Sequence, residues 1–343
     1  MQDIKELTIS ELEDILGDWK YPKFHARQIF FWIYQKSIKE FAQMSDLPLD
    51  LRRKLKENFS LFSFKLVTKL KSEDKTEKFI FQLKDDNLIE AVTIPAGKRI
   101  TGCISTQVGC KFSCSFCASG LLGFKRNLTS GEILEEILWL KNESSHKKLT
   151  HLVFMGTGEP LDNYDNVIRA IRLINSSEAF NIGARRITIS TCGIIPGIKW
   201  LSKESLQIEL SISLHAADDT VRSKIMPINK IYPLKDLLEV CREYIKRTDR
   251  QITFEYLLIK GINSDLPNAQ KLGRILQGLR LCKVNLIPAN PVAECKIGPP
   301  EKSEILQFRD YLLKQGLNIT LRRARGEDID AACGQLRLRY AEK

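Results

Sequence analysis

Three cysteines, Cys110, Cys114 and Cys117, stand close together in a loop flanked by Gly109 and Gly120. Their spacing also fits one face of a helix, but the glycines and the polar residues between the cysteines argue against a buried helix. Zinc sites usually have four protein ligands, and iron–sulfur clusters usually have four thiolates. Because this loop offers three thiolates, a four-iron cluster bound here would keep one iron open. A zinc site completed by a distant cysteine or histidine is the alternative.

An open iron could chelate the amino and carboxylate groups of S-adenosylmethionine and pass an electron to its sulfonium, which yields a 5′-deoxyadenosyl radical. The C-x3-C-x2-C spacing is highly specific when Phe116 precedes the last cysteine, as it does here. With these residues the sequence resembles the radical S-adenosylmethionine (radical SAM) superfamily. The resemblance implies a [4Fe-4S] cluster held by the three cysteines, S-adenosylmethionine as a cofactor and an electron donor such as flavodoxin or ferredoxin.

Glycine and polar residues follow the ends of several predicted strands, on the same side as the three-cysteine loop. The candidates for cofactor binding are Gly158, Glu159, Ser190, Ser213, Leu214, His215 and Asn290. Glycine lets the backbone approach a ligand closely, and the carboxylate of Glu159 could accept hydrogen bonds from a charged amino group. Each polar group alone is more often a strand-end cap. Together they predict one cofactor pocket.

A distant cysteine, Cys333, lies in the run Gly-Glu-Asp-Ile-Asp-Ala-Ala-Cys-Gly-Gln-Leu at 326–336. By itself it would more often be an inert loop cysteine. The run closely resembles the bacterial family that methylates C2 of adenosine in 23S ribosomal RNA, members of which also act on transfer RNA beside the anticodon. Further matching segments are 123–128, 158–161, 211–216, 226–229 and 285–291. The resemblance covers residues 20–336, and the small departures at Thr157 and Cys192 affect only details.

The family resemblance implies a radical route, since adenine C2 and the methyl group of S-adenosylmethionine are both electrophilic. Cys333 is first methylated, and a radical made from a second cofactor molecule takes hydrogen from that methyl group. The carbon radical adds to adenine C2. Cys103 then attacks the sulfur of Cys333, and a transient disulfide releases the methylated RNA. Glu90 matches the family position proposed for the base that removes the C2 proton, although on sequence alone it could be a surface glutamate of a strand.

Three other functions stay open. The nearest is methylation at C8 of the same adenosine. The segments 158–160 and 325–326 favour the C2 group over this C8 activity. Another radical enzyme, such as a methylthiotransferase or an activase, would not need Cys333 and Cys103. The non-enzyme alternative is a zinc-containing RNA-binding protein.

The composition is that of a soluble globular protein: 343 residues, 43% hydrophobic, 28% charged. The net charge of +11 favours a polyanionic partner, which the resemblance identifies as 23S ribosomal RNA and transfer RNA, although a solvated lysine-rich surface gives the same charge. Candidate RNA contacts are Lys20, Lys23, Arg27, Lys125, Arg126, Arg322, Arg323 and Arg325. With no apolar run of about 18 residues and no signal-peptide pattern, we expect a cytoplasmic monomer without membrane contact.

Three regions must position these residues. Residues 1–60 have helical periodicity, with Ser10 and Glu13 as a candidate capping box, and predict a helical accessory domain that could bind RNA. Residues 61–100 predict a β-rich extension with strands at 64–70, 79–83 and 89–94. Residues 101–343 predict the radical SAM core with the C-terminal catalytic loop.

Strands and helices alternate in the core. Predicted strands are 101–107, 150–155, 186–191, 207–213, 252–259, 283–288 and 317–322, and predicted helices are 130–142, 163–175, 234–246, 266–279 and 302–315. Thr129 and Glu132 form a second candidate capping box. Serial βα units favour a parallel sheet with its active site at the carboxyl ends of the strands. The expected fold is therefore α/β, a partial (β/α) barrel of the radical SAM type.

Overall fold

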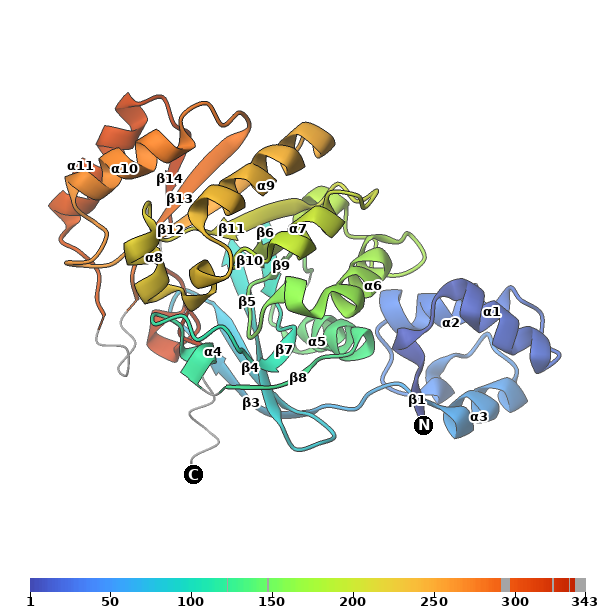
Figure 1. The fold of residues 1–343 in the computed structure, drawn as a ribbon. Coiled ribbons are helices and arrows are strands. Elements are labelled where there is room, and N and C mark those ends of the chain that lie inside the picture. Colours follow the sequence, from blue (N-terminus) through green and yellow to red (C-terminus); the bar gives the residue numbers. More distant parts are fainter. Residues whose placement is uncertain (122, 147, 291–296, 323, 333, 337–343) are drawn as a thin grey trace.

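The computed structural model describes residues 1–121, 123–146, 148–290, 297–322, 324–332 and 334–336. A ten-stranded sheet runs through the molecule in the order β14-β13-β12-β11-β10-β9-β6-β5-β4-β3 (Figure 1). Its parallel strands are β6 (Arg99–Cys103), β9 (His151–Phe154), β10 (Ile187–Thr191), β11 (Glu209–Ser213), β12 (Ile252–Leu258), β13 (Cys282–Pro288) and β14 (Ile319–Leu321). The predicted α/β fold with a partial barrel is confirmed.

Helices connect the parallel strands and lie around the outside of the curved sheet in Figure 1. They are α5 (Ser130–Glu143), α6 (Tyr164–Asn175), α7 (Ile195–Leu201), α8 (Asp219–Ile225), α9 (Leu234–Thr248), α10 (Leu266–Leu276) and α11 (Lys302–Lys314). In α6, Val167, Ile171 and Ile174 recur at helical spacing and are fully buried against the sheet. The inner face of the sheet is left to line cavities.

The strand predicted at 101–107 is interrupted in the structure. β6 ends at Cys103, and β7 (Gln107–Gly109) pairs antiparallel with β8 (Phe124–Asn127) in a separate two-stranded sheet. The break occurs because the backbone N–H groups of Thr106 and Gln107 donate to Thr157 O, at 2.9 and 3.2 Å, rather than continuing the ladder with β9. The loop with the three cysteines lies between β7 and β8.

The three strands predicted at 61–100 are confirmed as β3 (Lys65–Lys71), β4 (Glu77–Gln82) and β5 (Leu88–Ala96). They pair antiparallel and extend the central sheet, because β5 pairs with β6 in a register that places Val92 opposite Cys103. Side chains alternate across a strand, so Glu90, Val92 and Ile94 point to one face. The pairing therefore brings that face of β5 beside Cys103.

The N-terminal region contains α1 (Ile9–Asp18), α2 (His25–Phe30), a π-helical turn (Phe31–Gln35) and α3 (Leu49–Asn58), with β1 (Gln2–Asp3) parallel to β2 (Phe59–Ser60). The predicted capping box of Ser10 and Glu13 is wrong. Thr8 caps α1 instead: its hydroxyl accepts from Glu11 N at 3.2 Å, and the Glu11 carboxylate accepts from Thr8 N at 2.6 Å. Ser10 is already inside the helix.

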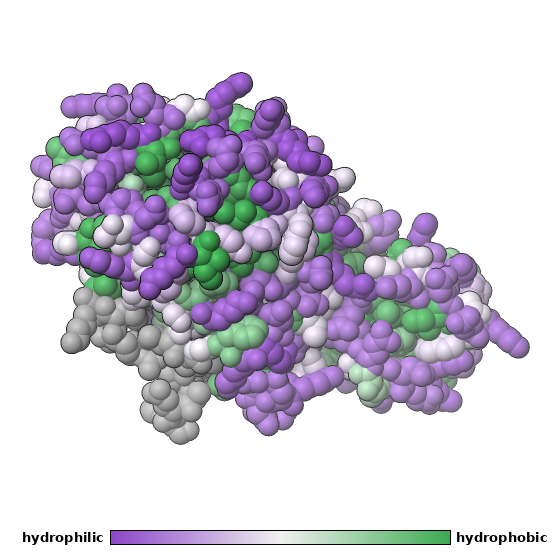
Figure 2. Space-filling model, viewed as in Figure 1, coloured by the Kyte–Doolittle hydropathy of each residue, from purple (hydrophilic) through white to green (hydrophobic). Residues whose placement is uncertain are grey.

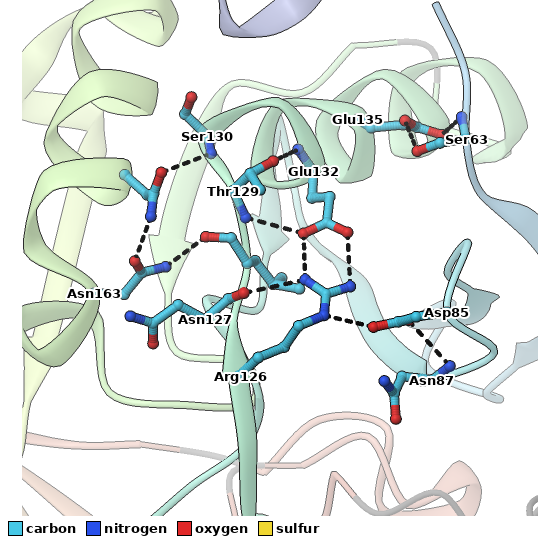
Figure 3. Close-up of polar contacts among 12 residues, drawn as sticks. Ser63, Asp85, Asn87, Arg126, Asn127, Thr129, Ser130, Glu132, Glu135 and Asn163 are labelled. Carbon is cyan, nitrogen blue, oxygen red and sulfur yellow. Dashed lines mark hydrogen bonds and ion pairs between the residues drawn. The ribbon is translucent and has the colours of Figure 1, made fainter. Parts of the chain in front are cut away.

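A buried ion pair holds the N-terminal region against the core. Lys5 Nζ lies 3.1 Å from the carboxylate of Glu135 on α5 and 2.8 Å from that of Asp3. Glu135 also accepts hydrogen bonds from Ser63 N at 2.7 Å and Phe64 N at 2.6 Å, and Figure 3 shows its contact with Ser63. The side chains of Lys5 and Glu135 are fully buried, so this contact orders the connection between the two regions.

The face of the molecule seen in Figure 2 is mostly hydrophilic, with small apolar patches between polar side chains. Among the residues that the structure describes, no helix is long and apolar enough to span a membrane.

Candidate active site

An arginine on β8 fixes the base of the three-cysteine loop (Figure 3). The Arg126 guanidinium holds the Glu132 carboxylate with two contacts, at 2.7 and 2.9 Å, and the Asp85 carboxylate at 2.6 Å. Glu132 in turn completes the capping box of α5 with Thr129, which confirms that prediction. Hydrogen bonding to Arg126 lowers the pKa of Asp85 to about 2. Arg126, a candidate RNA contact, thus ties β8 to α5 and to the turn before β5.

The loop itself is closed by a glycine contact. Gly109 has φ +75°, and a Cβ there would lie 1.6 Å from Gly123 O, so the two ends of the loop come together only because this residue has no side chain. Cys110 N then donates to Gly123 O at 3.2 Å. Cys114 and Cys117 lie along the loop, and α4 (Ala118–Leu121) begins directly after Cys117.

The three half-buried thiols border one cavity of about 170 Å³. Burial raises the pKa of the Cys110 thiol to about 12, and burial with the charges of Cys117 and Cys110 raises that of Cys114 well above its usual value. A bound cation would offset this by stabilising thiolates. In the described part of the chain, no three His, Cys, Asp or Glu side chains converge on one point as a single metal ion requires. Thiols spaced around a cavity fit a cluster in which each binds a different iron atom.

Six of the seven predicted cofactor-binding residues border this same cavity: Gly158, Glu159, Ser190, Ser213, His215 and Asn290. They come from the carboxyl ends of β9, β10, β11 and β13, as the parallel topology requires. Leu214 does not. Its side chain is fully buried in the hydrophobic core, while its backbone N donates to Glu255 O at 3.0 Å. Leu214 therefore stays a prediction: its side chain packs in the core, so a contact with a cofactor would come from its backbone.

Glu159 is a buried carboxylate at the wall of the pocket. It accepts Cys192 N at 2.7 Å and Leu161 N at 3.1 Å, and burial raises its pKa above the usual value. The side chains of Thr191 and Cys192 also hydrogen-bond to this carboxylate and favour its charged form. Gly158 precedes it with φ +106°, and a Cβ there would lie 2.6 Å from Gln107 Cβ. This glycine allows β7 to pack directly against the turn.

His215 has a defined tautomer. Its Nδ1 accepts Leu257 N at 3.0 Å, which places the ring proton on Nε2, and the ring packs edge-on against Phe116 with centroids 4.8 Å apart. Burial, with a smaller effect of the Arg222 charge, lowers the pKa of His215 to about 3. The imidazole is therefore a neutral Nε2–H donor at the wall of the pocket.

The neutral His215 predicts a pH dependence of stability. Its pKa is lower in the folded than in the unfolded state, so the unfolded state binds the extra proton, and stability falls as the pH drops below about 6.5. At pH 5.5 the loss is about 1.4 kcal/mol. In His215→Asn, asparagine tolerates the φ of +56° and can accept Leu257 N–H but does not titrate. Urea unfolding should show the stability gap between wild type and variant shrinking by about 1.4 kcal/mol from pH 7.5 to 5.5. A gap that does not change with pH would contradict this assignment.

Glu90 and Cys103 lie on the same face of neighbouring strands. Glu90 is 1% exposed, its Oε1 is 2.7 Å from Lys78 Nζ, and its Oε2 has no hydrogen bond among the described residues. Burial raises the pKa of Glu90, although Lys78 opposes the rise. Cys103 is buried in a cluster that includes Val92 and Ala331. Cys333 lies outside the described residues, and no disulfide joins two described cysteines.

The segment 326–332 is anchored on the turn between β3 and β4. Ser72 Oγ donates to Asp328 Oδ1 at 2.6 Å, and Gly326 N donates to Asp74 Oδ2 at 3.2 Å. Lys78, which pairs with Glu90, also donates to the carbonyl of Asp330 at 3.1 Å.

The segment 334–336 is anchored on the cysteine loop. Ala118 N donates to Gly334 O at 2.8 Å, and Ser119 Oγ donates to Leu336 O at 3.3 Å. Gly334 has φ +80°, and a Cβ there would lie 3.0 Å from Phe116 O. The two anchored segments thus contact the β extension on one side and the cysteine loop on the other, although both lie more than 200 residues further along the chain.

Sequence reasoning missed two buried charged residues of this region. Lys78 is the partner of Glu90, and Glu255 on β12 borders the cofactor cavity and accepts from Asn285 Nδ2 at 3.0 Å. Lys78 directly precedes the apolar run at 79–81 and Glu255 stands among large apolar residues of β12, where an unpaired charge would be costly, and this was the available signal.

Comparison with known proteins agrees with the fold and the cysteine loop. Residues 104–269 match the radical SAM superfamily, and residues 2–61 match the ribosomal RNA large subunit methyltransferase N-terminal domain. The crystal structure of a radical SAM methyltransferase from Sphaerobacter thermophilus is similar, with a TM-score of 0.95 and 41% identity over 98% of this chain and 99% of that chain. The fold and site thus define a radical SAM protein.

Two relatives are similar along nearly their whole length. Proteins of Clostridium novyi (strain NT) and Clostridium acetobutylicum, each described as a probable dual-specificity RNA methyltransferase RlmN, are 46% and 47% identical. The matches cover 99% and 100% of this chain and 99% of each relative. The chain belongs to the family of the RlmN dual-specificity RNA methyltransferases.

Proposed function

We propose that this protein is a radical SAM methyltransferase that methylates C2 of an adenosine in 23S ribosomal RNA and in transfer RNA. Family membership supports RNA methylation, and the names of the relatives describe a dual-specificity RNA methyltransferase. The observation that carries the proposal is the anchoring of 326–332 and 334–336. It joins the residues on both sides of Cys333 to the cysteine loop and to the face with Cys103 and Glu90.

In this proposal Cys110, Cys114 and Cys117 hold a [4Fe-4S] cluster, and the cavity beside them takes S-adenosylmethionine. When bound, these groups would supply the radical that removes a hydrogen atom from a methyl group on Cys333. The amino group of the cofactor would lie against the Glu159 carboxylate, and its other polar groups would meet the His215 Nε2–H and the neighbouring strand ends.

The other roles fall to residues of this chain. Cys333 carries the methyl group, and after loss of a hydrogen atom the carbon of that group forms the bond to adenine C2; the adduct radical gives up one electron, for which the cluster would be the acceptor. Glu90 takes the C2 proton. Burial raises the pKa of its carboxyl group and so makes the carboxylate a stronger base, while the charge of Lys78 compensates the buried carboxylate. The Cys103 thiolate attacks the sulfur of Cys333, so that the bond between this sulfur and the methylene carbon breaks and a disulfide forms; the carbon stays on adenine C2 and takes up a proton to become the methyl group. Residues 1–60 would act as an RNA-binding accessory domain, 61–100 as a β extension and 101–343 as the catalytic core.

Two measurements test this proposal, one of the cluster and one of the position of methylation. Protein purified without oxygen should be brown and contain iron and sulfide; a colourless protein with one zinc ion would contradict the cluster. With S-adenosylmethionine and a reductant, it should convert adenosine in unmodified 23S ribosomal RNA fragments and transfer RNA to 2-methyladenosine, measured by mass spectrometry of the digested RNA. Methylation solely at C8 would overturn the C2 assignment and favour the sister activity.

A further inference from the structure

A second cavity, of about 520 Å³, lies on the inner face of the sheet beside the cofactor cavity. Ligand sites typically measure roughly 300–1,000 Å³, so it is large enough for a small ligand. Such sites are usually apolar, whereas here inward-facing polar residues of successive strands line the wall, among them Thr101, Thr188 and Thr253. Glu255, Ile287 and other residues border both cavities, so the two are contiguous.

Cationic side chains gather where this cavity meets the amino-terminal edge of the parallel strands. Arg99 begins β6, Arg185 lies two residues before β10, and Lys283 is near the start of β13. Arg99 donates to Thr101 Oγ1 at 3.0 Å and Arg185 to Gln207 Oε1 at 3.4 Å. Within the described part of the chain, none of these three cations forms an ion pair with a carboxylate.

The carboxylates of the cavity do not balance its cations. The described lining residues include the cationic Arg99, Arg185, Lys283, Arg322 and Arg325, and the acidic Glu209 and Glu255. Glu209 is already engaged by Arg250, and Arg325 by Asp74 at 3.7 Å, both of which partners lie outside the lining; this leaves Arg99, Arg185, Lys283 and Arg322 with the one carboxylate of Glu255. Burial and the Arg322 charge lower the pKa of Arg99, and burial, Arg99 and Arg186 lower that of His151. Like charges facing one cavity favour an anion inside it, and guanidinium groups suit phosphate well.

Strand β6 sets the distance between Arg99 and the face with Cys103 and Glu90. Arg99 stands four residues before Cys103 on β6, which at ~3.3 Å per residue is about 13 Å between their Cα atoms. Ala331 and Ala332, just before Cys333, also line the cavity. A base held beside this tail would leave its sugar and phosphate directed along the cavity, and an extended arginine side chain would meet the phosphate.

We propose that Arg99, Arg185 and Lys283 bind a backbone phosphate of single-stranded RNA next to the adenosine that is modified. The inference rests on the proposed function, because it takes the modified base to lie beside the tail. It assigns the amino-terminal edge of the barrel to the RNA backbone and the carboxyl edge to the cofactor. The three residues act in positioning the substrate.

Salt-dependent binding tests this role apart from catalysis. The full-length holoenzyme is titrated, without reductant, with a hairpin RNA carrying an unpaired adenosine at several salt concentrations. Each neutralised phosphate of a single strand contributes about 0.7 to the slope of log K against log salt. The double variant Arg99→Gln/Lys283→Gln should bind several-fold more weakly, with a slope smaller by about 0.7. The single variant Arg99→Lys should keep the wild-type slope, because it keeps the positive charge.

The control is Lys314→Gln, an exposed lysine at the end of α11 outside both cavities, which should bind as wild type. Wild-type affinity and slope in the double variant would overturn the inference. So would a variant that loses binding of free adenosine monophosphate while its RNA slope is unchanged, because the cavity would then serve a mononucleotide. The wild-type protein could also bind the RNA with the larger salt dependence and yet fail to methylate it. That result would contradict the proposed function but would still support the phosphate site.

Discussion

A Cys103→Ala variant is expected to accumulate RNA attached covalently to the protein. In the proposed reaction the bond between the Cys333 sulfur and its methylene carbon breaks when a second thiolate attacks that sulfur, and the carbon stays on adenine C2 as the new methyl group. Cys103 is the candidate because it is buried in the cluster that contains Ala331, two residues before Cys333, and pairs in register with Val92. Without this thiol the earlier steps proceed and the release step stops, so turnover falls by orders of magnitude while adduct accumulates.

Denaturing gels with labelled RNA and mass spectrometry of tryptic peptides measure the adduct. The peptide that contains Cys333 should carry the modified nucleotide after RNase digestion. A Cys282→Ala variant is the matched control, because Cys282 is a half-buried cysteine at the start of β13 outside both cavities, and it should release product as wild type does. The double variant Cys103→Ala/Cys333→Ala should form no adduct. Normal turnover by Cys103→Ala would exclude its assigned role.

Glu135→Ala is expected to cost about 3 kcal/mol of stability. Breaking a buried ion pair from one side typically costs 3–5 kcal/mol, because the other charge stays buried. Here Lys5 would lose Glu135 but keep Asp3, which favours the low end of that range. The backbone N–H groups of Ser63 and Phe64 would also lose their acceptor.

Urea unfolding of the full-length protein at pH 7.5 measures this loss, and limited proteolysis reports whether residues 1–60 detach first. Glu143→Ala is the control on the same helix, since Glu143 pairs with the exposed Lys39 at 2.9 Å and should cost less than about 1 kcal/mol. A Lys5→Met/Glu135→Leu variant removes both charges and should recover most of the stability. A loss below about 1 kcal/mol in Glu135→Ala would show that the pair does not secure the N-terminal region.

The parts of the site that follow from local sequence were predictable. The cysteine loop is one short segment, and the pocket residues stand at the carboxyl ends of strands, which parallel topology brings to one edge. The side chain of Leu214 packs in the core, because sequence proximity to Ser213 does not reveal which side of the chain faces the cavity. The capping box was placed two residues late, since Thr8 with Glu11 and Ser10 with Glu13 have the same pattern.

The partners across long sequence distances could not be derived from the residues alone. Nothing in the pattern pairs Lys78 with Glu90 rather than with another carboxylate, or docks 326–332 on the turn at 72–76. Those contacts depend on the antiparallel register of β4 and β5 and on where the tail leaves β14. The cationic edge of the barrel was equally hidden, because Arg99, Arg185 and Lys283 are scattered along the chain and meet only in the folded sheet.

The anchoring of the tail has a consequence for the order of folding. Asp328 bonds to Ser72 across 256 residues and Leu336 to Ser119 across 217, so both contacts close very long loops. Such contacts form late, after the local βα units, because they depend on a sheet that is already assembled. A few hydrogen bonds and the packing of Ala331 and Leu336 in a small cluster hold the tail, so we expect that it can open while the sheet stays intact. Amide hydrogen exchange at 326–332 should then be faster than in β9 to β13, because the tail docks last on the assembled sheet and opens first.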